Sequence, residues 1–205
     1  MKEYPAIPRS TGQNFREFDA YVFDKIDGSN LRFEWSPKAG WSKAGTRHHL
    51  FDGSDEVFGE ALPIFEKQWD ETLSKIAHHE RWQRLTAFFE FWGAQSLAGV
   101  HVAGDPKNLT LLDVAPLGQE MLPARDFLKL FGELEIPRFL GTYRWTRGLV
   151  EQVRRNEIEG VTFEGVVGKG QERNRIVMAK AKTQNWIDLI LSHYGEVAGR
   201  RIVES

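Results

Sequence analysis

The stretch FDAYVFDKIDGSNLRFEW, residues 18–35, contains two short aromatic-rich segments on either side of a turn sequence. Residues 18–25 and 30–35 are predicted to be strands, and Asp27-Gly28-Ser29 is predicted to be the tight turn that joins them as a hairpin. Lys25 therefore stands at the end of an apolar strand, directly before a turn. A solvated structural role is the ordinary interpretation of such a lysine, so a chemical role depends on residues elsewhere in the chain.

Turn clusters and apolar periodicity place the remaining elements. Residues 36–40 form a second turn cluster, which predicts a third strand at 41–47. Apolar residues at three- and four-residue steps predict a helix capped by Ser54 or Asp55, which Pro63 would kink or restart. The other expected strands are 85–92, 109–114, 161–167 and 176–182, and the other expected helices are 125–131, 146–155 and 185–194, the last ending at Gly195.

These elements define the expected fold class. The turns between the first three strands are too short for parallel crossovers, so their sheet is expected to be antiparallel. Because helices are interspersed with the strands, we predict an α+β fold with antiparallel sheets flanked by helices, rather than a doubly wound α/β fold. The 205 residues contain no repeat and no long linker, which predicts a single domain over residues 1–205.

Composition excludes several classes of protein. The chain has no cysteine, which excludes disulfides, a thiolate nucleophile and cysteine-ligated metal sites. The formal net charge of −2 gives no general positive field for nucleic acid, so any such surface must come from local clustering. No apolar run approaches the ~18 residues of a membrane span, so no membrane association is expected and a cytoplasmic location is inferred.

Basic residues near the C-terminal end of the sequence are candidates for the cations that would act on Lys25. A lysine becomes a nucleophile only when its pKa is lowered from about 10.4 by burial or by neighbouring cations. Lys180 and Lys182, two residues apart in a predicted strand, project onto one face. Residues 168–182 include five basic side chains and one acidic side chain, a local +4 in a chain of −2. Such a concentration of positive charge suits a polyphosphate.

Four motifs, in this order, resemble those of the covalent nucleotidyltransferase superfamily, which includes ATP-dependent RNA and DNA ligases and mRNA capping enzymes. The K-x-D-G-x-N/R motif matches 25–30, the aromatic-Glu motif 89–93, E-G-V-V 164–167 and K-x-K 180–182. Order and spacing agree over residues 20–183, whereas any one motif alone would be weak. Asn30, in place of arginine, is typical of RNA ligases, above all of the nick-sealing type.

The resemblance implies a nucleotidyltransferase (ATP-grasp-like) domain that uses ATP and Mg²⁺ or Mn²⁺. Lys25 would attack the α-phosphorus of ATP to give lysyl-AMP, the AMP would pass to a 5′-phosphate, and a 3′-hydroxyl would displace it. Lys180 and Lys182 would neutralise charge at the α-phosphate, and Glu164 would bind the metal. Nucleic acid, as RNA ends or a nicked duplex, is the implied partner.

The remaining nucleotide contacts follow from the same resemblance. Glu90 would accept hydrogen bonds from the ribose, and Asp27 and Asn30 belong to the nucleotide-binding motif around Lys25. Arg47 is the expected phosphate- or ribose-contacting arginine, with Lys43 as the alternative.

The sequence departs from the family in two places. The strand 109–114 lacks the aromatic residue on which many relatives stack adenine, and packing by leucine or valine is the expected replacement. The seven tryptophans are expected mostly in the core, with Trp41 or Trp186, near the motifs, as candidates for stacking on a base. Too few residues flank the motifs for an OB-fold domain, so the chain is expected to be the adenylyltransferase domain alone, with a partner protein as a possible source of a second domain. A DNA ligase core, a capping-type guanylyltransferase and a non-catalytic nucleotide- or RNA-end-binding module remain as alternatives.

Overall fold

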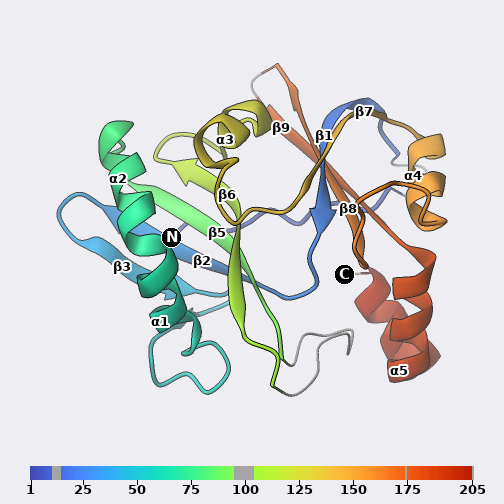
Figure 1. Cartoon of the computed structure of the whole chain (residues 1–205), viewed down its shortest axis with the longest axis horizontal. Helices are drawn as coiled ribbons and strands as arrows, with labels where there is room; N and C mark the ends of the chain where they lie inside the picture. Colours follow the sequence, from blue (N-terminus) through green and yellow to red (C-terminus); the bar gives the residue numbers. More distant parts are fainter. Residues whose placement is uncertain (11–14, 95–103, 174, 205) are drawn as a thin grey trace. The chain divides into compact units, whose positions relative to one another are not determined.

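The computed structural model describes residues 1–10, 15–94, 104–173 and 175–204, and in these the chain forms two antiparallel sheets with associated helices (Figure 1). The five-stranded sheet has the order β4-β3-β2-β5-β6 and the four-stranded sheet the order β7-β1-β8-β9. The α+β class with antiparallel sheets is thus confirmed. The strands are β1 Phe18–Lys25, β2 Ser29–Ser36, β3 Gly40–Gly45, β4 Leu50–Phe51, β5 Leu85–Trp92, β6 Asn108–Pro116, β7 Phe139–Trp145, β8 Gly165–Glu172 and β9 Arg175–Lys182. The helices are α1 Ala61–Phe65, η2 Glu66–Asp70, α2 Glu71–His79, α3 Ala124–Phe131, α4 Arg147–Arg154 and α5 Gln184–Glu204.

The chain divides into two compact units, each with its own sheet. The five-stranded unit contains the described residues 1–5, 28–94 and 104–136, and the four-stranded unit contains the described residues 6–10, 15–27, 137–173 and 175–204. The single domain over residues 1–205 stays a prediction. Among the described residues, no helix is both long enough and apolar enough to cross a membrane.

The predicted hairpin between β1 and β2 is wrong, because the two strands belong to different sheets. β1 pairs with β7 and β8, and β2 pairs with β3 and β5. Each strand buries its apolar side chains in a different core: Val22 packs in the core of the four-stranded unit, and Phe33 in that of the five-stranded unit. The turn sequence therefore separates two sheets instead of closing one hairpin.

Helices cover one face of the five-stranded sheet, where β2 and β5 point their apolar side chains (Figure 1). The Phe33 and Phe65 rings stack at 4.1 Å, and Trp69 donates from Nε1 to the Leu109 carbonyl at 3.2 Å. The first helix begins at Ala61 and not at Ser54 or Asp55. The Asp55 carboxylate accepts from the backbone N–H groups of Val57 and Phe58, at 3.0 and 2.8 Å, but the following residues form turns. Pro63 lies in the first helical turn, where proline is tolerated.

The four-stranded unit packs α4 against β7, β8 and β9. Trp145 is fully buried there and stacks on Phe18 at 5.9 Å. Helix α4 matches its prediction, with Thr146 as the N-cap accepting from the Leu149 N–H at 3.2 Å. Strand β7 was not predicted. Its residues have mixed exposure and include Gly141, with φ of 123°, so its sequence shows no regular alternation of apolar and polar residues.

Two further boundaries in this unit differ from the prediction. β8 begins at Gly165 rather than at residue 161, since residues 161–164 form no strand. Gly195, with φ of 74°, ends the first part of α5 as predicted, but a second helical stretch follows to Glu204. The two stretches meet through a small core that contains Trp186, Ile190 and Val203.

Candidate functional site

The centre of the candidate site is a row of three residues on neighbouring strands of the four-stranded sheet. Gly165 of β8 lies opposite Lys25 of β1 on one side and opposite Lys182 of β9 on the other. Since neighbouring strands are about 4.8 Å apart, the two lysine backbones are about 10 Å apart across the glycine. Their long side chains can span that interval and meet a common partner.

The common partner is the buried carboxylate of Glu164, the residue before Gly165. Its Oε2 accepts from the Lys25 ammonium at 2.8 Å, and its Oε1 lies 3.5 Å from the Lys182 ammonium. The Glu164 side chain is 4% exposed, the Lys182 side chain 6% and the Lys25 side chain 19%. Residues from motifs that are far apart in the sequence thus share one carboxylate, and Lys25 is its most accessible member.

Gly165 admits no other residue at this point in the row. It has φ of 146°, and a β-carbon built on it would lie 2.0 Å from the Ala181 carbonyl oxygen. In the Glu164-Gly165 pair, the glutamate therefore supplies a charged side chain, and the glycine allows the backbone to contact β9 closely.

The surroundings of Lys182 in this site shift its ionisation strongly. Burial lowers the pKa of Lys182 to about 8, against the opposing effect of the Glu164 carboxylate. The charges of Lys25 and Lys180 lower it further, so all three lysines interact electrostatically. Lys180 is also buried, and its backbone pairs with residues 8–10 through the Lys180 N–H to the Pro8 carbonyl and the Ser10 N–H to the Lys180 carbonyl.

Trp186 connects Lys182 with Asp27. The Lys182 ammonium lies 4.0 Å from the centroid of the Trp186 ring, and the Trp186 Nε1 donates to Asp27 Oδ2 at 3.4 Å. Because Trp186 is 1% exposed, it has no open face for a base, and the stacking role considered for it is wrong. Trp41 is half-buried and donates to the Ser74 hydroxyl at 3.0 Å.

Two predicted residues, Asn30 and Glu90, lie together in the five-stranded unit. They are directly opposite each other on β2 and β5, and the Asn30 amide donates to the Phe89 carbonyl at 3.4 Å. Gly28 packs against the same strand, since a β-carbon there would lie 2.4 Å from the Phe91 carbonyl oxygen and 3.0 Å from Glu90 Cγ. Gly28, the glycine of the lysine motif, therefore allows close contact with the strand that contains the aromatic-Glu motif.

Arg47 and Lys43 also belong to the five-stranded unit. Lys43 forms an ion pair with Glu34 at 2.9 Å, whereas the exposed Arg47 lies in the turn after β3, where its carbonyl accepts from Arg32 at 3.5 Å. Lys43 is therefore engaged in a structural pair, which favours Arg47 of the two as the nucleotide-contacting residue.

Several residues that the sequence reasoning missed contact the predicted ones. Tyr4 donates to Asp113 at 2.6 Å, and burial together with the nearby charges of Asp113 and Glu90 raises its pKa well above the ordinary value. Asp24 and Thr183 form hydrogen bonds to residues 162–164, the segment that ends at Glu164. Their only signal in the sequence is position, because Asp24 directly precedes Lys25 and Thr183 directly follows Lys182.

In the four-stranded unit, the Glu164 carboxylate is a suitable protein ligand for a divalent metal. Among the described residues, no group of three or more acidic or histidine side chains could hold an ion. A single buried carboxylate, Glu164, fits Mg²⁺ or Mn²⁺ that is carried mainly by phosphate oxygens and water, which is how Mg²⁺ commonly binds.

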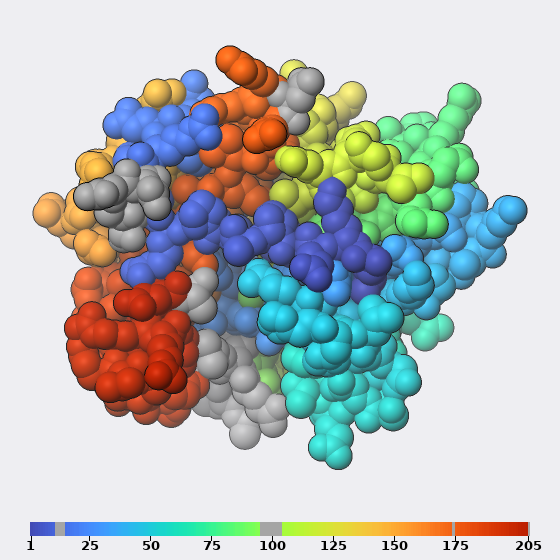
Figure 2. Space-filling view, turned by 180° about the vertical axis from the view of Figure 1, so that it is seen from behind, coloured from blue at the N-terminus to red at the C-terminus, as the bar shows by residue number. Residues whose placement is uncertain are grey.

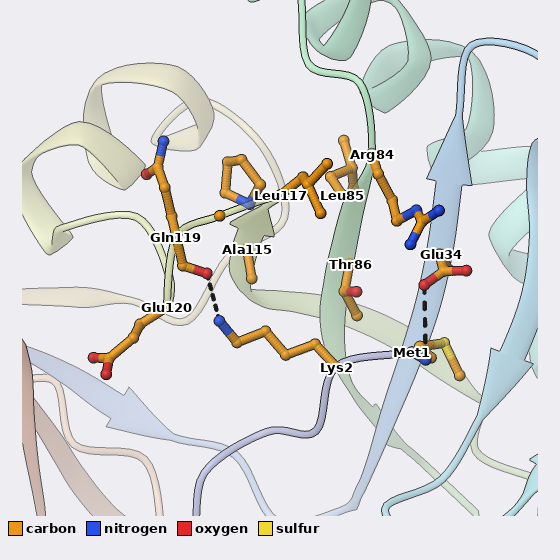
Figure 3. Close-up of a pocket in the computed structure, with 12 residues that line it drawn as sticks. Met1, Lys2, Glu34, Arg84, Leu85, Thr86, Ala115, Leu117, Gln119 and Glu120 are labelled. Carbon is orange, nitrogen blue, oxygen red and sulfur yellow. Dashed lines mark hydrogen bonds and ion pairs between the residues drawn. The ribbon is translucent and has the colours of Figure 1, made fainter.

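A separate pocket of about 470 Å³ lies in the five-stranded unit (Figure 3). Its lining combines Lys2 and Arg84 with Glu34 and Glu120, and it includes none of the predicted site residues. The N-terminal segment, in the darkest blue, is visible at the surface in Figure 2. With both signs of charge present, the pocket shows no preference for a phosphate ligand.

Comparisons with known proteins found similarity in structure only. No protein-family model matches the sequence, and no curated protein matches it. Two solved structures of an archaeal ATP-dependent RNA ligase match with TM-scores of 0.68 and 0.63, at 18% and 20% identity. Both matches cover 94% of this chain and 51% of the other chain.

A Naegleria gruberi RNA ligase with PPi matches with a TM-score of 0.61 at 13% identity, covering 87% of this chain and 52% of that chain. A mutant of the same ligase was solved with AMP and Mn. The present chain thus spans about half the length of the structures it matches. It has the fold found in these ATP-dependent archaeal and Naegleria RNA ligases, in agreement with the covalent nucleotidyltransferase superfamily indicated by its motifs.

Proposed function

We propose that the chain is an ATP-dependent RNA ligase that acts through a covalent lysyl-AMP intermediate. The observation that carries this proposal is the sharing of the Glu164 carboxylate by Lys25 and Lys182. A buried carboxylate between two lysines is costly as a purely structural device, since hydrophobic replacements of buried ion pairs are often neutral or stabilising. The same charges are suited to holding a nucleotide phosphate next to a nucleophilic amine.

In the first step, the Lys25 Nζ attacks the α-phosphorus of ATP. A P–N bond forms, the bond between the α-phosphorus and the bridging oxygen breaks, and pyrophosphate leaves. The attacking amine must be neutral, because an ammonium has no free electron pair, so one proton passes from Lys25 to solvent water. Lys180 and Lys182 neutralise negative charge that moves onto the phosphate oxygens, which is the main contribution a protein makes to phosphoryl transfer.

In the following steps, AMP moves from the protein to the nucleic acid. A 5′-phosphate oxygen attacks the same phosphorus, the P–N bond breaks and Lys25 is restored. A 3′-hydroxyl then attacks the 5′-phosphorus, loses its proton and displaces AMP, which closes the strand. Both are in-line displacements, so correct placement of the reactants supplies much of the rate.

Further residues bind the metal and the nucleotide in this proposal. Glu164 holds Mg²⁺ or Mn²⁺, which would supply charge neutralisation at the phosphates. Glu90 accepts from the ribose, Asp27 and Asn30 bind the nucleotide, and Arg47 contacts phosphate or ribose. The titles of the Naegleria structures, which name ATP, AMP, PPi and Mn, support this choice of ligands. A partner protein that supplies further nucleic-acid contacts belongs to the same proposal.

Intact mass spectrometry after incubation with ATP and Mg²⁺ or Mn²⁺ tests the first step. We expect a gain of one AMP in the wild type and none in Lys25→Arg, which keeps the charge but not the nucleophile. Lys75→Arg is the matched control, because Lys75 is an exposed lysine that pairs with Glu71 on α2. Absence of an adduct in the wild type over a range of pH and metals would favour the non-catalytic binding module.

Competition between substrates tests the later steps. We expect sealing of a nicked duplex with RNA at the 3′-hydroxyl side to be faster than sealing of an all-DNA nick. Faster sealing of the DNA nick would identify a DNA ligase core. Adduct formation with GTP in preference to ATP would identify a capping-type guanylyltransferase.

A further inference from the structure

The segment Thr162-Phe163-Glu164 is held in place by three side-chain hydrogen bonds and one backbone hydrogen bond, and not by strand pairing. It precedes β8, and the described structure assigns it to no strand or helix. Its first residue is fixed by Asp24, a 5% exposed carboxylate on β1. The Asp24 Oδ1 accepts from the Thr162 N–H at 3.0 Å, and Oδ2 accepts from the Thr162 hydroxyl at 2.7 Å.

The other end of the segment is held by Thr183, which is fully buried. Its hydroxyl donates to the Phe163 carbonyl at 2.6 Å, and its N–H donates to the Glu164 carbonyl at 3.0 Å. The same hydroxyl accepts from the Trp186 N–H at 3.2 Å, so Thr183 also caps the start of α5.

These two contacts lie next to the proposed catalytic lysines in the chain. Asp24 is bonded to Lys25, and Thr183 is bonded to Lys182. Lys25 is therefore connected to the segment through its ammonium at Glu164 and through the hydrogen bonds between Asp24 and Thr162. Lys182 is connected to it through its ammonium at Glu164 and through the hydrogen bonds of Thr183 to Phe163 and Glu164. Rotation or displacement of the segment would change both ammonium–carboxylate distances at once.

We propose that Asp24 and Thr183 are positioning residues that set the Glu164 carboxylate between Lys25 and Lys182. This inference rests on the proposed function of the lysines. Displacements of about 1 Å can reduce catalytic rates about 100-fold, so a loosened segment should slow the chemistry more than it weakens nucleotide binding. A purely structural role predicts the opposite pattern, with loss of stability and an unchanged rate in the folded fraction.

The test measures single-turnover formation of lysyl-AMP as a function of ATP concentration. For Thr183→Val and Thr162→Val, we expect the limiting rate constant to fall about 10- to 100-fold, while half-saturation by ATP changes about twofold or less. Thr183→Ser and Thr162→Ser keep the hydroxyls and should restore most of the rate. Thr162→Val retains the Thr162 N–H to Asp24, so it serves if Thr183→Val fails to fold.

Thr146→Val is the matched control. Thr146 caps α4 as Thr183 caps α5, but its hydroxyl accepts from the Leu149 N–H and lies at the start of α4, away from the 162–164 segment in the sequence. We expect it to lower the thermal midpoint like Thr183→Val while leaving the rate unchanged. Equal rate losses in Thr146→Val and Thr183→Val would overturn the proposal.

A double-mutant cycle shows whether the effect passes through Glu164. In a Glu164→Gln background, Thr183→Val should have little further effect on the rate, because the carboxylate that it positions is absent. Fully additive losses would contradict the inference. If the wild type forms no lysyl-AMP, the proposed function fails, and a crystal structure of Thr183→Val then decides the positioning: an unchanged 2.8 Å contact between Lys25 and Glu164 overturns it.

Discussion

Asp24 and Glu34 are buried carboxylates whose surroundings shift their pKa values in opposite directions. Burial raises the pKa of Asp24 above its usual 3.8, although hydrogen bonds from Thr162 oppose the shift. Burial also acts to raise the pKa of Glu34, but the hydrogen bond and charge of Lys43 outweigh it, together with other positive groups, and the pKa is lowered. The two residues therefore make opposite contributions to stability as pH changes.

The first prediction compares Asp24→Asn with Glu34→Gln in denaturant unfolding at several pH values. A raised pKa means that the folded protein binds the Asp24 proton more tightly, so the stabilising contribution of Asp24 is lost as pH rises from about 3.8 through the folded pKa. The unfolding free energy of Asp24→Asn minus that of the wild type should therefore increase with pH. For Glu34→Gln the difference should decrease with pH, and a common sign for both variants would contradict the assignment.

Trp186 contacts both Lys182 and Asp27. We expect Trp186→Ala to lose about 3–5 kcal/mol of stability, as for other truncations of large buried aromatic residues to alanine. Combination with Lys182→Met in a double-mutant cycle should show a coupling of about 0.5–2 kcal/mol, the size of an ammonium–ring attraction. Unfolding free energies from denaturant titrations give this coupling, and a value near zero would show that the ring acts only by filling space.

At the scale of elements, β8 is the strand on which the site depends, because it separates the two lysine-bearing strands. Gly165→Ala should be strongly destabilising, by about 2 kcal/mol or more, since it combines a positive φ with a backbone clash. Gly53→Ala is the matched control, because a β-carbon on Gly53 would meet nothing within 4 Å. Thermal and denaturant unfolding of both variants measure the difference, and equal losses would refute the steric argument.

Elements formed by local patterns could be predicted from the sequence, and those formed by distant partners could not. Residues 18–25 and 85–92 form strands over their predicted lengths, because their β-branched and aromatic residues favour strands by themselves. The pairing of β1 with β7 and β8 was missed, because a short turn indicates a hairpin whatever partners lie further along the chain. The helix start was placed too early, since Asp55 caps a turn in the same way that it would cap a helix.

At the scale of the whole molecule, nucleotide binding should appear as added stability. A ligand that binds only the folded chain at a concentration of ~100 Kd raises the unfolding free energy by about 2.7 kcal/mol. We expect ATP with Mg²⁺ to raise the thermal midpoint of Lys25→Arg, which cannot form the adduct, and to raise that of the double variant Lys25→Arg/Lys180→Ala less. Differential scanning calorimetry measures both midpoints. Identical shifts would exclude Lys180 from phosphate binding.

The sequence by itself determined the chemical groups and the order in which they occur: a lysine before a turn, a glutamate before a glycine, and two lysines on one strand face. These are properties of neighbouring residues, and local backbone geometry is enough to interpret them. Only the tertiary structure decided that Glu164 lies between Lys25 and Lys182, that Trp186 is buried and that Asp24 and Thr183 hold the intervening segment. Strand register and burial depend on the packing of residues far apart in the chain, and no local pattern contains that information.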